Sequence, residues 1–273
     1  MAHASVIVRA RDAEQVIGRP LSVLRRQTIT PEIIVVDSGS ADRTVEIARP
    51  LCDRLIEISS EEFTYGRALN IGARAASAPI HFALSAHCFP GRDDWIERSL
   101  AHYERDDVAA TSGSGILPDG EPLTQPFFED AAHARANPFW GFSNHASSWR
   151  ASVWHEFPFD EQLPACEDKE WAFRVLDAGW TIVFDPAITI DRWHALYGRA
   201  RDRYARQRRE WAALPMFTEV SRYGLRDLAH EWWTEADDGN RPAWFNRFLH
   251  YRRWAGLAGK YAGYRASRKA ACR

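Results

Sequence analysis

The chain has 273 residues, a formal net charge of −2 and a hydrophobic content of 45%. This length suits one large α/β domain with an appendage, and it allows a substantial buried core. The near-neutral charge gives no general attraction to nucleic acid. No run of about 18 uncharged apolar residues, the length that suggests a membrane span, occurs in the sequence.

The four cysteines are widely spaced and form no CxxC pair; they are Cys52, Cys88, Cys166 and Cys272. This spacing favours reduced thiols in the cytosol over a disulfide framework or a zinc finger. The first residues enter a predicted strand at once, without the charged and apolar regions of a signal peptide. We therefore expect a cytoplasmic protein.

Strands and helices alternate through the first half of the chain. Strands are predicted at 5–10, 32–37, 54–59, 79–85 and 108–113, and helices within 14–27, 41–50, 66–76 and 92–105. Pro20 should interrupt the first helix because it lacks a backbone N–H. This alternation predicts a mainly parallel sheet flanked by helices. The stretch 114–142, rich in Pro, Gly and Phe, is predicted to be a long loop across the mouth of the site.

The second half of the chain is predicted to contain a helix at 167–178, a strand at 181–184 and helices after about residue 195. Residues 241–273 carry lysines, arginines and aromatic side chains but no acid. Basic-aromatic helices favour the surface of an anionic membrane, which here would be its inner face. A packing helix or a homodimer contact explains the same pattern, and no nucleic-acid recognition motif accompanies it.

The first functional signal lies at the end of the second predicted strand. The β-branched run Ile33–Val36 indicates a strand buried on both faces, and Asp37 follows it. A Ser-Gly-Ser turn then leads into a helix that Ser40 could cap. Ligands of open α/β sheets bind beyond the carboxyl ends of the strands, so Asp37 and the end of the first strand predict a nucleotide cradle. The alternative is that Asp37 only caps its loop.

These segments resemble the opening of the family 2 glycosyltransferases, which have the GT-A fold. The likeness continues in family order, over roughly residues 4 to 210, through Glu61–Gly72, Ser143–Asn144, Arg150, Phe157–Glu161, Glu167–Trp171 and Trp193–His194. Segments 63–67 and 193–197 look most like bacterial rhamnosyltransferase-like members. The resemblance implies a GT-A domain at 1–210, with a nucleotide-sugar half at 1–113 and an acceptor half at 114–210. A basic-aromatic helical extension then occupies 211–273.

By this resemblance, the protein is an inverting glycosyltransferase that uses a nucleoside-diphosphate sugar (UDP, dTDP or GDP) and an unidentified acceptor. Such a transfer requires a nucleotide pocket, stabilisation of the leaving diphosphate and a base for the acceptor proton. The resemblance places the donor against residues at three strand ends and on the third helix: Arg9, Ala10, Arg11, Asp37, Arg67, Asn70, Ser85 and Ala86. Arg67 could instead be a structural partner of an acidic side chain.

Two adjacent acids, Glu167 and Asp168, begin a predicted helix. Free N–H groups and the helix dipole hold a carboxylate there as an anion. In the family motif that they resemble, the Asp is the catalytic base. Asp168 is therefore assigned that role, with Glu167 orienting its neighbours or touching acceptor hydroxyls. The alternative is that both are ordinary helix-start charges. His145 and Trp149 are further predicted to line the acceptor side.

The turn after the fourth strand departs from the family. Most members carry an Asp-x-Asp motif that holds a divalent metal against the diphosphate, whereas this chain has Ser85-Ala86-His87-Cys88. Imidazole suits Mn²⁺ better than Mg²⁺, and diphosphate oxygens suit both. We therefore expect His87 and His194 to hold a divalent cation, Mn²⁺ or Mg²⁺, once the donor is bound. Direct neutralisation by these histidines and nearby arginines is the alternative.

Two other functional classes share some of these features. A sugar-phosphate nucleotidyltransferase has a similar nucleotide cradle, but this chain lacks a Gly-rich phosphate loop after its first strand. A catalytically silent sugar-nucleotide-binding protein would explain the missing carboxylates, but the presence of Glu167 and Asp168 argues against it.

Overall fold

The structure, a computed structural model, describes residues 3–138, 140–192, 200–218, 224–234 and 251–271. The backbone divides into two compact units. The first comprises Met1–Gln162 and Glu167–Trp193, and the second comprises Leu163–Cys166 and His194–Arg273.

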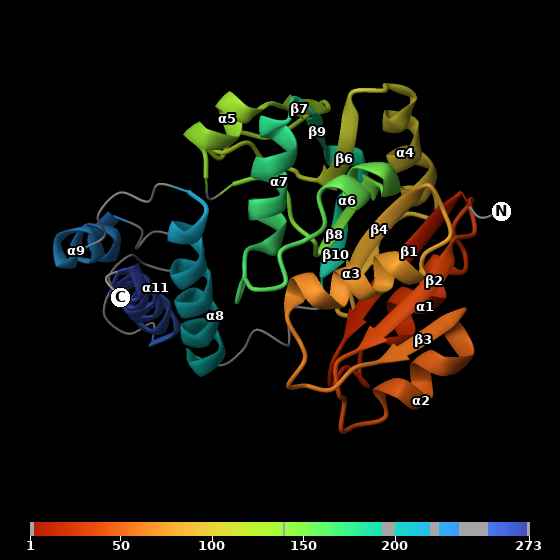
Figure 1. Cartoon of the computed structure of the whole chain (residues 1–273), viewed down its shortest axis with the longest axis horizontal. Helices are drawn as coiled ribbons and strands as arrows, with labels where there is room; N and C mark the ends of the chain where they lie inside the picture. Colours follow the sequence, from red (N-terminus) through yellow and green to blue (C-terminus); the bar gives the residue numbers. More distant parts are fainter. Residues whose placement is uncertain (1–2, 139, 193–199, 219–223, 235–250, 272–273) are drawn as a thin grey trace. The chain divides into compact units, whose positions relative to one another are not determined.

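The first half of the sheet in the first unit is built as the sequence predicts. Its strands are β1 (Ala4–Ala10), β2 (Glu32–Asp37), β3 (Arg54–Glu57) and β4 (Ile80–Ser85), and the intervening helices are α1 (Gly18–Leu24), α2 (Thr44–Ala48) and α3 (Tyr65–Ala75). The strands lie in the order β3-β2-β1-β4, and all three pairings are parallel. Figure 1 shows these strands side by side.

The other half of the sheet is mixed. It continues from β4 through β8 (Ala146–Arg150), β6 (Val108–Gly113), β9 (Thr181–Asp185) and β7 (Phe127–Glu129). Strand β8 runs antiparallel to both of its neighbours, β7 runs antiparallel to β9, and β6 and β9 are parallel. The sequence did not indicate β8, because its core positions include Ser147 and Ser148, whose burial is made possible by hydrogen bonds rather than by an apolar run.

The long loop predicted at 114–142 is wrong in part. This stretch contains β7 and helix α5 (Ala131–Ala136), and Ile116 forms a bridge with Pro122. The Asp130 side chain caps α5 by accepting a hydrogen bond from the His133 N–H at 2.8 Å. The remaining elements of the unit are β5 (Cys88–Pro90), α4 (Trp95–Ala101), α6 (Ala151–Glu156), α7 (Glu167–Asp177) and β10 (Ile190–Arg192).

Several helices are shorter than predicted. Helix α1 starts only at Gly18, and Pro20 lies in its first turn, where a missing N–H removes no intrahelical bond. Helices α2 and α4 are each continued by a short 3₁₀ helix, at Arg49–Leu51 and His102–Glu104. Ser40 does not cap α2, because it lies in the turn before the helix and bonds to Asp37 and Asp12.

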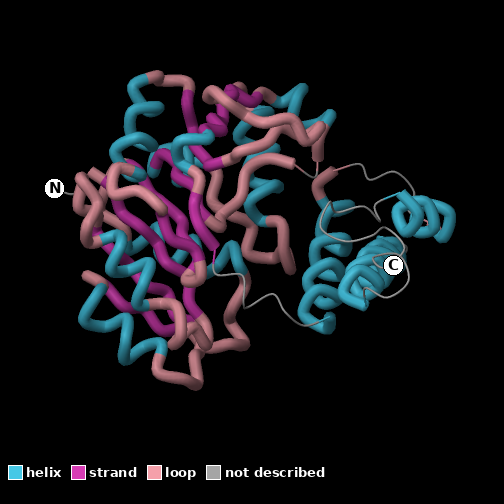
Figure 2. Tube along the Cα trace, turned by 180° about the vertical axis from the view of Figure 1, so that it is seen from behind, coloured by secondary structure: helices cyan, strands magenta, loops and turns pink. Residues whose placement is uncertain are grey.

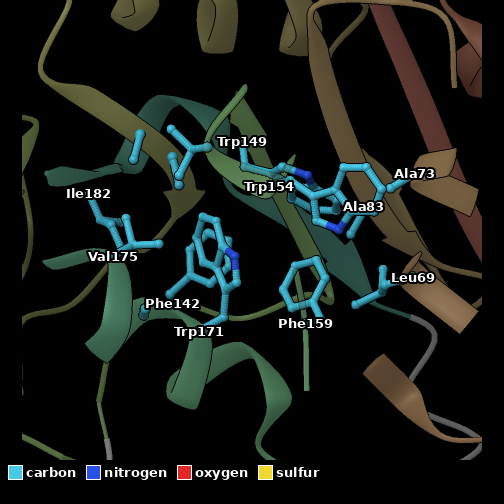
Figure 3. Packing of buried hydrophobic residues seen from close by; sticks show 14 of the residues in the cluster. Leu69, Ala73, Ala83, Phe142, Trp149, Trp154, Phe159, Trp171, Val175 and Ile182 are labelled. Atoms are coloured by element: carbon cyan, nitrogen blue, oxygen red, sulfur yellow. The ribbon is translucent and has the colours of Figure 1, made fainter. Parts of the chain in front are cut away.

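The core lies on both faces of the sheet, as the continuous apolar runs predict. On β1, Ile7 packs with α3, α6 and α7 on one face, whereas Val6 and Val8 pack with α1, α2 and α4 on the other. Figure 3 shows the first face, where Trp149, Trp154 and Trp171 pack with Phe142 and Phe159. Trp149 is 0% exposed, so the prediction that it lines the acceptor side is wrong.

The second unit contains helices α8 (Ala200–Ala213), α9 (Leu225–Thr234) and α11 (Tyr251–Ala271). Helices α8 and α11 lie side by side in both Figure 1 and Figure 2. A Cβ atom at Gly259 or Gly263 would collide with the backbone of α8, so glycine permits this close approach. The domain boundary predicted at residue 210 falls inside α8. None of the helices described here has the length and hydropathy needed to cross a membrane.

Candidate functional site

The carboxyl ends of β1, β2 and β4 meet at one edge of the sheet. Ala10 pairs with Asp37 on one side of β1, and Arg9 pairs with Ser85 on the other. The Ala10 carbonyl accepts hydrogen bonds from the backbone N–H and the hydroxyl of Ser38, at 3.0 and 3.1 Å. The structure therefore brings together the strand ends from which the sequence predicts a nucleotide cradle.

The loops after β1 and β2 hydrogen-bond to each other at this edge. The Asp12 N–H donates to the Ser40 hydroxyl oxygen at 2.9 Å, and the Ala41 N–H donates to Asp12 Oδ1 at 2.9 Å. The Ala13 N–H also donates to the Thr44 hydroxyl oxygen at 2.7 Å. Arg11 is half-exposed beside this loop pair, with its Nε 3.9 Å from Asp12 Oδ2. Reciprocal bonds of this kind hold the rim of the cradle in one conformation.

Asp37 is buried beneath these loops, with 1% of its surface exposed. Its Oδ2 accepts hydrogen bonds from the N–H groups of Gly39 and Ser40, and its Oδ1 accepts one from the Ser40 hydroxyl. Gly39 has a φ of +77°, which suits glycine. Asp37 thus shapes the turn in this structure, and its contact with a ribose or base stays a prediction.

Asp168 and Glu167 open helix α7, as the sequence predicts. Asp168 is half-buried, and its Oδ2 accepts a hydrogen bond from the Asn144 N–H at 3.2 Å. Its Oδ1 accepts one from the Lys169 N–H at 2.9 Å. Two backbone donors at a helix start hold this carboxylate in one orientation, which is a property that a general base requires.

Glu167 is more deeply buried, with 4% of its surface exposed. Its Oε1 lies 3.2 Å from Arg9 Nη1 and 3.5 Å from Asn144 Nδ2. Burial, and then the neighbouring Asp168 charge, raise the pKa of the Glu167 carboxyl to about 7, while Arg9 acts in the opposite direction. Glu167 therefore serves as a buried partner of Arg9 at the end of β1.

Asn144 connects these groups, and the sequence assigned no role to it. It is 1% exposed and lies in the loop before β8. Its carbonyl accepts from Arg9 Nη2 at 2.9 Å, and its side-chain Oδ1 accepts from the Ser147 hydroxyl at 3.0 Å. The only sequence signal was its presence in the Ser143–Asn144 match to the family.

The turn after β4 carries the predicted metal ligand His87. The Ser85 N–H donates to the His145 carbonyl at 2.9 Å, and the Ala86 N–H donates to the Arg9 carbonyl at 3.2 Å. The rings of His87 and His145 are 5.9 Å apart. Strand β5, which starts directly after His87, pairs with β10, whose last residue is two positions before His194. His194 itself lies outside the described residues.

Within the described ranges, no group of three His, Cys, Asp or Glu side chains could hold a metal ion. His87 and His145 bring two imidazole rings near each other, but the turn Ser85–Cys88 contains no Asp or Glu. These side chains alone do not make a site for Mg²⁺ or Mn²⁺, which take several oxygen or nitrogen ligands. A cation at this turn would need further ligands beyond these described side chains.

Asn70 differs from its predicted role beside the donor. Its amide nitrogen donates to the Phe159 carbonyl and to Glu161 Oε1, at 2.8 and 2.9 Å. Its amide oxygen accepts from the Trp154 indole N–H and the Phe159 N–H, at 2.9 and 3.1 Å. All four hydrogen-bonding positions of the amide are taken, so Asn70 fixes the 157–161 segment and has no capacity left for a ligand.

Arg67 lies near this segment and contacts two acids. Its Nη2 is 3.4 Å from Glu62 Oε1, and its Nη1 is 3.8 Å from Glu161 Oε2. Its side chain is 42% exposed. This geometry corresponds to the acid-pairing alternative rather than to a donor contact.

The sequence model of Glycosyl transferase family 2 matches residues 5–157, which is more than half of the chain. The O-antigen chain rhamnosyltransferase RfbN of Salmonella typhimurium is 26% identical over 205 residues, covering 66% of this chain and 63% of that protein. The glycosyltransferase AglE of Haloferax volcanii is 26% identical over 194 residues, and the match again covers 66% of this chain and 63% of that protein. The chain thus spans less than two thirds of the length of these curated relatives.

Two solved structures are similar over nearly the whole chain. The mannosyltransferase PcManGT of Pyrobaculum calidifontis, in complex with GDP-Man and Mn²⁺, has a TM-score of 0.61 and 19% identity, and the match covers 99% of this chain and 74% of that one. S. aureus TarS 1-349, in complex with UDP-GlcNAc, has a TM-score of 0.56 and 14% identity over 98% and 92% of the two chains. These likenesses establish the GT-A fold.

Proposed function

Because the chain belongs to glycosyl transferase family 2, we propose that it transfers a sugar from a nucleoside-diphosphate sugar to an acceptor with inversion at the anomeric carbon. The observation that carries this proposal is the link between β1 and α7. Arg9, at the nucleotide edge of the sheet, bonds to Glu167, the neighbour of Asp168. A half-buried, oriented carboxylate therefore lies beside the cradle, where an acceptor would meet the donor.

Asp168 acts as the general base in this proposal. It takes the proton from the acceptor group as that group attacks the anomeric carbon from the face opposite the leaving group. One bond forms between the acceptor atom and the anomeric carbon, the bond from that carbon to the diphosphate oxygen breaks, and the nucleoside diphosphate leaves. General-base assistance of this kind contributes roughly 10²–10⁴ in rate.

The leaving diphosphate needs positive charge beside it. We propose a divalent cation, Mn²⁺ or Mg²⁺, that arrives with the donor and takes His87 as a protein ligand beside the diphosphate oxygens. Such a cation would stabilise the charge of the departing diphosphate. The similar structure of PcManGT contains Mn²⁺, which supports this choice of metal.

The donor half is placed at 1–113 and the acceptor half at 114–210 in this proposal. The nucleotide is UDP, dTDP or GDP, and the similarity to RfbN favours a deoxyhexose such as rhamnose as the sugar. TarS and PcManGT, by contrast, were solved with UDP-GlcNAc and GDP-Man, so a donor panel must include all three nucleotides.

A donor panel with detection of the released nucleoside diphosphate tests the proposed function. Release from one donor, increased by an acceptor extract, is the expected result. Binding of a donor without any release would favour the silent sugar-nucleotide-binding protein. Release of pyrophosphate from a nucleoside triphosphate and a sugar phosphate would favour the nucleotidyltransferase.

A further inference from the structure

Arg9 is directed toward the protein interior. Its side chain and that of Glu167 are 12% and 6% exposed, and its two terminal nitrogens bond to Glu167 Oε1 and to the Asn144 carbonyl. The guanidinium carbon also lies 5.5 Å from the centre of the Tyr65 ring. Because both charges of the pair are shielded from water, removing one partner leaves a costly unpaired charge.

The same asparagine that accepts from Arg9 donates to Asp168. The Asn144 N–H bonds to Asp168 Oδ2, and the Asn144 side-chain amide reaches Glu167 Oε1. We propose that Arg9, Asn144 and Glu167 form a positioning unit that holds the Asp168 carboxylate beside the end of β1, so that Arg9 serves the base rather than the donor. This inference rests on the proposed role of Asp168.

The chemistry of Arg9 fits this role better than that of lysine would. A planar guanidinium donates in two directions at once, here to a carboxylate and to a carbonyl, whereas an ammonium acts as a single point charge. Asn144 in turn is fixed through its N–H, its carbonyl and its side chain. A small displacement of Asn144 would therefore tilt the Asp168 carboxylate without removing it.

Four variants test the unit: Arg9→Lys, Arg9→Gln, Glu167→Gln and the double variant Arg9→Gln/Glu167→Gln. The control is Arg25→Gln, which removes another Arg–carboxylate pair, with Asp53, away from the site. A misplaced catalytic group lowers turnover by up to about 10²-fold, so we expect kcat to fall roughly 10- to 100-fold in Arg9→Lys and Arg9→Gln. Calorimetric affinity for UDP, dTDP and GDP should change less than about threefold.

The double variant separates a shared role from independent ones. It removes both buried charges together, so it should fold even where Arg9→Gln alone does not. If the two residues act as one unit, its kcat should match that of Glu167→Gln. If the kcat losses of the two single variants multiply in the double variant, the proposal is overturned. A loss of nucleotide affinity of about tenfold with kcat retained would also overturn it, and would make Arg9 a donor ligand.

The NMR signal of the Asn144 backbone amide reports on the positioning unit independently of any transfer activity. The groups facing the Glu167 carboxyl are Arg9 on β1, Asn144 before β8 and Asp168 on α7. The Asn144 signal should shift as Glu167 titrates near neutral pH, and Glu167→Gln should abolish that titration. An Asn144 amide that Arg9→Lys leaves unmoved overturns the positioning unit, whether or not transfer is seen. A responsive amide in a wild-type protein that transfers no sugar counts against the proposed function alone.

Discussion

The two halves of the sheet in the first unit assemble their functional groups over different distances in the sequence. In the donor half, the hydrogen bonds that join the loops after β1 and β2 link residues only 28 to 31 positions apart. Between the two halves, the bonds from Arg9 on β1 to Asn144 and Glu167 span 135 and 158 positions. The proposed cradle is thus a product of neighbouring βα units, whereas Asp168, the proposed base, is positioned by contacts that only the complete fold creates.

This difference suggests a division of labour between the halves. The cradle should determine nucleotide affinity, and the network around Asp168 should determine turnover. Substitutions on the two sides should therefore change different kinetic constants.

The largest effect is expected at Asp168. Asn at this position keeps the shape of the side chain but cannot accept the acceptor proton, so transfer should fall by roughly 10²-fold or more. Nucleotide affinity, measured by calorimetry, should survive because Asp168 lies outside the cradle. Asp177→Asn, at the other end of α7, is the matched control, since Asp177 pairs with Arg135 on the surface. Turnover of Asp168→Asn near the wild-type level would reject the base.

Removal of divalent cations should have the next largest effect. A bound cation stabilises a departing diphosphate by several kcal/mol, so excess EDTA should lower transfer by about 10²-fold. Added Mn²⁺ or Mg²⁺ should restore it, and His87→Ala should raise the metal concentration that half-restores activity. Full activity in EDTA would instead leave charged side chains to neutralise the diphosphate.

Asp37 tests the cradle side of the comparison. Asp37→Ala removes the acceptor for three hydrogen bonds in the Gly39–Ser40 turn, and it should weaken nucleoside diphosphate binding by about 1–3 kcal/mol. At saturating donor, kcat should change little. Asp53→Ala is the control for general destabilisation. It removes a carboxylate directly before β3 that accepts a hydrogen bond from the Ile33 N–H. Unchanged affinity for every nucleotide would place the cradle elsewhere.

The elements that the sequence predicts also differ between the two halves of the sheet. Strands β1 and β2 and helices α3 and α7 lie within a residue or so of their predicted bounds, because β-branched runs and helical periodicity are local signals. Strand β8 was missed because its buried serines depend on partners such as Tyr103 and Thr111, which come from other elements.

The site shows the same limit. The predicted roles of Asp168 and Glu167 came from the resemblance to the family motif, because acids at a helix start are by themselves an ordinary local pattern. The sequence could not show that the Asn70 amide hydrogen-bonds to the 157–161 segment, or that Asn144 links Arg9 to Asp168. Those roles depend on which remote backbone groups reach each side chain after folding.

His81, on β4, should make the donor half sensitive to acid. It is 2% exposed beside Trp149 and Trp154, and burial lowers its pKa to about 4. Because the unfolded chain binds a proton at about pH 6.5 and the folded chain does not, stability is full above that pH and is lost as pH falls toward 4. His81→Phe should flatten this part of the curve by on the order of 2 kcal/mol, measured by denaturant unfolding. If the free energy of unfolding of His81→Phe depends on pH as steeply as that of the wild type, His81 is not the source of this acid sensitivity.

The smallest effect is expected in the second unit, where Lys260 of α11 contacts two other helices. Lys260 Nζ lies 2.8 Å from Glu231 Oε2 on α9 and 5.6 Å from the centre of the Trp211 ring on α8. Since both charged side chains are about four-fifths buried, Lys260→Gln should lower the free energy of unfolding by about 1 kcal/mol, at the upper end for an ion pair that keeps some exposure. The protein should stay in the supernatant when anionic vesicles are sedimented at physiological salt, because a lysine engaged inside the unit contributes little to membrane attraction. Arg268→Gln provides a comparison on the same helix. If the protein instead sediments with the vesicles, and less of it does so when Lys260 or Arg268 is replaced, the membrane-surface interpretation of this extension is favoured over the packing one.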